Sequence, residues 1–166
     1  SAPGGFPRCG PGIDCGRWTN NKVIVARSYV EQLNFAFGTN PADTRPDDNS
    51  PRDRVGHGTA AAMMAAGRRV RGPAAEVVGV APRAWLGNYK VFGSPGVNDF
   101  TYSPVIINAL TDALNDGMDI VTLNLGRPSL WPSLARTCGD GQNLSCDIEA
   151  EAVHNATLRG LIVVAA

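Results

Sequence analysis

The sequence predicts an α/β fold in which strand–helix–strand crossover units build a parallel sheet. Apolar, β-branched runs alternate with segments whose apolar residues recur at helical spacing, and this alternation continues along most of the chain. The strand runs are almost continuously apolar, which is typical of strands covered on both faces by helices. In such sheets the loops at the carboxyl ends of the strands form the functional site.

The individual elements follow from local composition. Strands are expected at 22–30, 84–92, 119–126 and from Leu161 onward, and helices at about 57–67, 104–117 and 147–159. Pro104 suits the first helical turn, where a missing N–H is harmless, and Gly117 and Gly160 suit helix ends. The Gly-, Pro- and polar-rich segments 1–21, 40–54, 68–76 and 93–102 are expected to be loops, and 127–146 a long insertion. A dinucleotide-binding sheet is the structural alternative, but no G-x-G-x-x-G follows a strand.

Length and charge narrow the class of protein. The 166 residues, 43% of them hydrophobic, are predicted to form a single partial domain, with 1–21 irregular and 22–166 as its α/β core. Fifteen basic and fifteen acidic residues cancel, which argues against nucleic acid or an anionic membrane as a partner. No apolar run approaches the roughly 18 residues of a membrane span, and the start shows no signal-peptide pattern. The last apolar run stops at Ala166 inside a predicted buried strand, so we expect a segment of a longer protein. A monomer is expected.

The four cysteines fall into two local pairs, Cys9 with Cys15 and Cys138 with Cys146. Each pair brackets a loop containing Gly and Asp, and two small disulfide loops would indicate an exported protein. Other connectivities are open, although local pairing has the lowest closure cost. A zinc site is the alternative, but the spacings are not C-x-x-C and neither histidine adjoins a pair.

The segment Gly56-His57-Gly58-Thr59 opens the predicted Ala/Met-rich helix. Glycine on both sides removes Cβ atoms that would block approach to the imidazole, and Thr59 can satisfy free N–H groups of the first turn. We therefore expect His57 to be exposed at a cleft and able to exchange protons near neutral pH, as a catalytic base does. Asp53 is expected to hold the preceding loop by accepting backbone hydrogen bonds.

Several segments together, in the same order, resemble the subtilases, the subtilisin-like serine peptidases. They are GHGT at 56–59, GVAP at 79–82, YKVF at 89–92, DGMDI at 116–120, LNLG at 123–126 and GLIVVAA at 160–166. The similarity extends from about Lys22 to the end of the chain. It implies a subtilisin-like, doubly wound parallel sheet with helices on both faces, of which this chain holds an incomplete part.

The resemblance also implies roles for individual residues. His57 would be the general base, which takes the proton of a serine nucleophile and returns it to the leaving amine. An extended substrate would pair with the strand edge at 123–126. The implied substrate-binding residues are Leu123, Asn124, Leu125, Gly126 and, in the opposite segment 93–100, Gly96.

The chain departs from the family pattern in its other catalytic groups. The triad order is Asp, His, Ser, but only the histidine is found, and no G-T-S-x-A segment occurs. Residues 12–14 are weakly similar to the end of D-[ST]-G-I-D, the family segment that carries the catalytic aspartate. Gly10 stands at the position of that aspartate, so we expect the true one upstream of Ser1. The resemblance thus implies a secreted serine endopeptidase acting on peptides or proteins, of which this segment alone is inactive. The alternative is a degenerate peptide-binding module, against which the intact Gly56-His57-Gly58 argues.

No cofactor is expected. Many subtilases bind calcium in a loop after the histidine helix, so the resemblance allows a calcium site in a full-length protein. In this chain the corresponding residues 68–78 offer only Glu76 as a carboxylate ligand. We therefore predict no metal site here.

Overall fold

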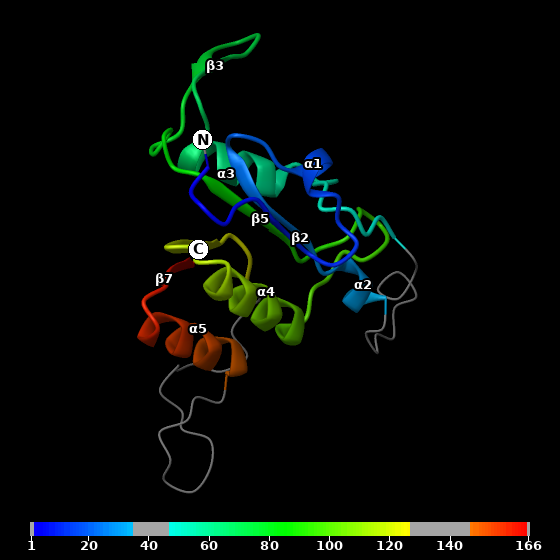
Figure 1. Ribbon diagram of the computed structural model, residues 1–166. Helices are drawn as coiled ribbons and strands as arrows, with labels where there is room; N and C mark the ends of the chain where they lie inside the picture. The colour runs from blue at the N-terminus through cyan, green and yellow to red at the C-terminus, as the bar shows by residue number, and fades with distance from the viewer. Residues whose placement is uncertain (1, 35–46, 127–146, 166) are drawn as a thin grey trace, which may run out of the picture. The chain divides into compact units, whose positions relative to one another are not determined.

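The computed structural model describes residues 2–34, 47–126 and 147–165. The chain divides into two compact units, Ser1–Thr101 and Tyr102–Ala166 (Figure 1). The predicted insertion 127–146, with Cys138 and Cys146, lies outside the described residues, as do 40–46 of the predicted polar loop.

The first unit contains a three-stranded parallel sheet. Its strands are β1 (Arg8–Cys9), β2 (Val23–Ser28) and β5 (Leu86–Lys90), in the order β1-β2-β5. Ile24, Val25 and Ala26 of β2 are buried, as the β-branched run predicts. The predicted strands at 22–30 and 84–92 and their parallel pairing are confirmed.

The described residues of this unit include the helices α1 (Cys15–Trp18), α2 (Val30–Leu33) and α3 (His57–Ala66). Helix α3 confirms the prediction. The segment 1–21, expected to be irregular, contains β1 and α1, and Asp14 caps α1 by accepting from the Gly16 N–H at 3.0 Å. Helix α2 was also missed. Helices of four residues are too short to show a hydrophobic period, so packing and caps decide them instead.

A short antiparallel hairpin, β3 (Val70–Arg71) with β4 (Glu76–Val77), projects from this unit (Figure 1). The prediction of a loop at 68–76 is therefore wrong. Gly72 N–H donates to the Ala75 carbonyl at 2.9 Å to close the turn, and Arg69 pairs with Glu76. The strands have only two residues each and their residues are exposed, so the sequence carries no alternating apolar signal for them.

After the hairpin the chain returns to the end of α3. The N–H groups of Gly79, Val80 and Ala81 donate to carbonyls of Gly67, Met64 and Ala65 at 2.9–3.0 Å. These bonds satisfy carbonyls that the end of a helix leaves unpaired. A Cβ atom on Gly79 would lie 2.3 Å from the Gly67 nitrogen, so only glycine permits this approach.

The second unit alternates helices and strands: α4 (Ser103–Asn115), β6 (Ile120–Leu123), α5 (Ile148–Leu158) and β7 (Ile162–Ala165). Strands β6 and β7 pair in parallel, with Leu123 opposite Ala165. Leu110, Ala156 and Leu161 form the buried centre. Gly117 and Gly160, with φ of 78° and 93°, follow the helices as predicted.

Cys9 and Cys15 are joined by a disulfide, with their Cα atoms 5.8 Å apart. The bond links the end of β1 to the first residue of α1. Within the described residues, none of the helices combines the length and apolar character that crossing a bilayer requires.

We expect Gly79→Ala to weaken the junction between the 79–81 segment and α3. The added methyl group would force the two backbones apart, at a cost of about 1–3 kcal/mol in the free energy of opening. Amide hydrogen exchange of α3 in the folded full-length protein measures this cost. Gly4→Ala is the control, because a Cβ there meets no atom within 4 Å. Equal exchange in both variants would refute the proposed close packing.

We also expect both cysteine pairs to be oxidised in the native protein. Thiol titration under denaturing conditions, without reductant, should then detect no free thiol from the four cysteines of this segment. Detection of all four thiols would contradict the disulfide and would leave a metal site as the alternative.

Candidate functional site

His57 is the first residue of α3, and its side chain is exposed. The residue before it, Gly56, forms the N-cap with a φ of +89°. A side chain is strained in this left-handed conformation, so Gly56 is required by the backbone. At Gly58 an added Cβ would meet only the Asp53 Oδ2 atom, at an ordinary 3.7 Å. The backbone conformation therefore requires the first glycine, whereas neither conformation nor the described contacts require the second.

Asp53 organises the turn that carries His57. Its Oδ1 atom accepts from the N–H groups of Val55 and Gly56, both at 2.8 Å. Its Oδ2 atom accepts from Thr59, from the N–H at 2.9 Å and from the hydroxyl at 2.6 Å. The predicted loop-holding role of Asp53 is confirmed. Thr59 was expected to accept from free N–H groups of the first helical turn, and this is wrong. Asp53 is the acceptor, and both the N–H and the hydroxyl of Thr59 donate to it.

These hydrogen bonds also fix the charge of Asp53. Burial raises the pKa of the carboxyl, but hydrogen bonds from Thr59, Gly56 and Val55 outweigh burial and hold the pKa well below its usual range. Asp53 is therefore ionised at neutral pH. A negative charge at the N-terminus of α3 is favourable because the helix dipole is positive there.

The predicted substrate-binding segment 93–100 forms a closed, partly exposed turn in the same unit. Gly96, at its tip, is exposed and has a φ of +70°. Its N–H donates to both carboxylate oxygens of Asp99, at 2.8 and 2.9 Å. The Gly93 N–H donates to the Asn98 carbonyl at 2.9 Å, which closes the base of the turn.

The other predicted substrate-binding residues lie in the second unit. Leu123 is the last residue of β6, and Asn124, Leu125 and Gly126 follow it at the carboxyl end of the strand. Asn124 is exposed, and its amide donates to the Thr122 hydroxyl at 3.5 Å. His57 and Gly96 belong to the first unit, so the structure describes the two parts of the predicted site separately.

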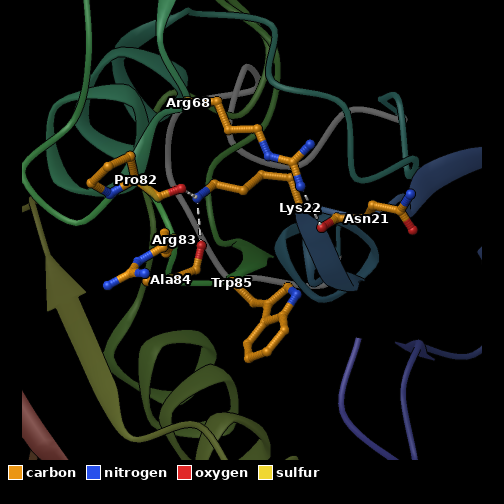
Figure 2. A pocket seen from close by; sticks show the side chains of 7 residues that line it. All are labelled: Asn21, Lys22, Arg68, Pro82, Arg83, Ala84 and Trp85. Atoms are coloured by element: carbon orange, nitrogen blue, oxygen red, sulfur yellow. Dashed lines mark hydrogen bonds between the residues drawn. The ribbon is translucent and has the colours of Figure 1, made fainter. Parts of the chain in front are cut away.

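An open pocket of about 310 Å³ lies elsewhere in the first unit (Figure 2). It is lined by Asn21, Lys22, Arg68, Pro82, Arg83, Ala84 and Trp85, none of which is a predicted site residue. Lys22 donates to the carbonyls of Pro82, at 3.0 Å, and Ala84. Burial, followed by the charge of Arg68, lowers the pKa of Lys22. In the described ranges, no group of three or more His, Cys, Asp or Glu side chains is placed to hold a metal ion.

Comparison with known proteins places these features in a family. Residues 19–166 match the model of the Subtilase family. The chain is 35% identical to Subtilisin-like protease SBT3.16 of Arabidopsis thaliana over 116 residues, which cover 64% of this chain and 15% of that protein. It is 35% identical to Subtilisin-like protease SBT3.11 of the same plant over 129 residues, 72% of this chain and 16% of that protein. The chain thus spans less than a fifth of the length of these relatives, and it belongs to the subtilase family.

Proposed function

We propose that this chain is the histidine-bearing segment of a subtilisin-type serine endopeptidase, with His57 as the general base. The observation that carries the proposal is the exposed imidazole on the first residue of α3, next to a turn fixed by Asp53. A general base must be held in place and remain open to the substrate, and this position provides both. In the reaction His57 would accept the serine proton and later donate it to the leaving amine.

Substrate binding would use the two predicted segments. Extended peptide would pair with the backbone at Leu123, Asn124, Leu125 and Gly126, at the carboxyl end of β6. The turn at 93–100, with Gly96 exposed at its tip, would be a further substrate-binding segment. The exposure of Gly96, Asn124 and Gly126 supports this role, because an extended ligand can reach the chain at these residues.

The triad acid and the serine nucleophile would come from the rest of a longer protein. The relatives are several times longer than the stretch that this chain matches, which supports a division of the triad along the full sequence. In that protein we infer that the parallel pairs described here join one doubly wound sheet. The Cys9–Cys15 disulfide supports an exported protein, since such bonds persist in oxidising compartments.

We expect His57→Ala in the full-length protein to reduce peptide hydrolysis by about 10³-fold or more, because the serine loses its proton acceptor. The labelling rate with a fluorophosphonate should fall in parallel. His154→Ala is the matched control, since His154 is the chain's other histidine and is exposed on α5. Peptide binding without hydrolysis by the wild-type protein would favour the binding-module alternative.

We expect Asp53→Asn to lower kcat/KM more than its effect on helix stability explains. An amide can accept at only one of its two positions, so the Val55–Thr59 turn would lose part of its support. Asp147→Asn is the control, because Asp147 caps α5 by accepting from Glu149 and Ala150. Asparagine caps a helix about as well as aspartate, so the control should change the stability of α5 little. Equal activity of the two variants would show that Asp53 does not position His57.

A further inference from the structure

The segment 47–53 connects the two predicted site elements of the first unit. At one end, the Asp47 Oδ2 atom accepts from the Ser94 N–H at 2.6 Å and from the Asn98 amide at 3.4 Å. Asn98 is completely buried, and its carbonyl accepts from Gly93 at the base of the 93–100 turn. Asp47 therefore contacts the base of this turn. At the other end, Asp53 holds the turn that begins α3. One short stretch of chain therefore touches both the predicted substrate-binding turn and the support of His57.

The middle of this segment is fixed to strand β5. The Lys90 ammonium donates to the carbonyls of Asp48, at 3.0 Å, and Ser50, at 3.1 Å. The Asn88 amide donates to the Pro51 carbonyl at 2.6 Å. Asn88 and Lys90 are two residues apart on a strand, so both side chains point to the same face of the sheet. The strand thus anchors the segment at Asp48, Ser50 and Pro51.

Lys90 is unusual for its position, because its side chain is only 8% exposed at the end of a sheet strand. Lysine is rarely buried to this extent unless its ammonium group is paired. Burial lowers the pKa of Lys90, and the charges of Asp48 and Asp47 act in the opposite direction. The ammonium group replaces its lost water with the two backbone carbonyls of the segment.

Asp48 adds a second set of contacts to the same segment. Its carboxylate accepts from the Arg54 guanidinium at 2.6 Å and from the Ser50 N–H at 2.9 Å. Burial raises the pKa of Asp48, but hydrogen bonds from Ser50 and Arg54 and the charge of Lys90 outweigh it and lower the pKa to about 2. Asp48 therefore stays ionised throughout the neutral range and can keep its bonds to Arg54 and Ser50.

We propose that Lys90 is a positioning residue that acts through segment 47–53 on both the His57 turn and the substrate-binding turn at 93–98. The assignment of these two turns to catalysis rests on the proposed function. The inference that Lys90 and segment 47–53 hold both turns in place does not depend on it. Removal of the ammonium group would leave the carbonyls of Asp48 and Ser50 without their donor. Both ends of the segment should then loosen together.

The direct test is amide hydrogen exchange of full-length Lys90→Met, a variant that keeps an unbranched, apolar side chain of similar reach. We expect faster exchange, by about tenfold, both at 55–59 and at 93–98. Lys22→Met is the matched control, because Lys22 also donates to two backbone carbonyls of this unit, those of Pro82 and Ala84. Exchange in the control should remain unchanged at both turns. Acceleration at only one turn, or at neither, would overturn the proposal.

Asn88→Ala provides a second, milder variant if Lys90→Met does not fold. It removes the bond to the Pro51 carbonyl and leaves the buried ammonium group in place. We expect a smaller acceleration at the same two turns. Unchanged exchange in this variant, with Lys90→Met unfolded, would also overturn the proposal, since the segment would then not depend on β5.

Peptide hydrolysis gives the functional readout. In Lys90→Met we expect a rise in KM for extended peptides and a fall in kcat, together about ten- to hundredfold in kcat/KM. Lys22→Met should retain wild-type values of both constants. If the wild-type protein hydrolyses no peptide and reacts with no fluorophosphonate, the proposed function fails. The exchange result would still decide whether Lys90 supports both turns.

Discussion

The candidate site depends on the hydrogen bonds that the Asp53 carboxylate accepts from the turn at the start of α3. Helix α3 begins immediately after a glycine in the left-handed conformation, and this geometry leaves the N–H groups of the turn without helical acceptors. Asp53 accepts from three of these residues with its two oxygens. Among the residues that the structure describes, none of these hydrogen bonds involves the imidazole of His57. The histidine is therefore held by its backbone, and its side chain remains open to solvent.

The sequence was sufficient to predict the main parallel strands, helix α3 and the helices of the second unit. Strand β2 is largely β-branched and α4 has a clear helical period. Helices α3 and α5 have little periodicity, and their ends, GHGT at 56–59 and Gly160, indicated them instead. The role of Asp53 was also predictable, because an aspartate shortly before a helix commonly accepts from the backbone of the turn. The family followed from several motifs in order, and the match over residues 19–166 confirms it.

Features that depend on long-range contacts were not predictable in the same way. Lys90 lies in an apolar run, and nothing local indicates that its ammonium group reaches the carbonyls of Asp48 and Ser50, some forty residues earlier. The β3–β4 hairpin has two residues in each strand, which is too few for a period. The role of Thr59 was assigned wrongly because a threonine in a first turn can accept or donate, and only the position of Asp53 decides between them.

The structure also changes the argument that separates an enzyme from an inactive relative. The intact glycines were expected to count against a degenerate module. Gly56, however, is required by its φ of +89°, so an inactive relative with the same turn would need it equally. The imidazole is different, because within the described part of the chain the Asp53 carboxylate accepts from Val55, Gly56 and Thr59 and not from His57. A module without catalysis could replace His57 and keep the turn intact. The catalytic proposal is therefore supported by His57 and not by the neighbouring Gly56.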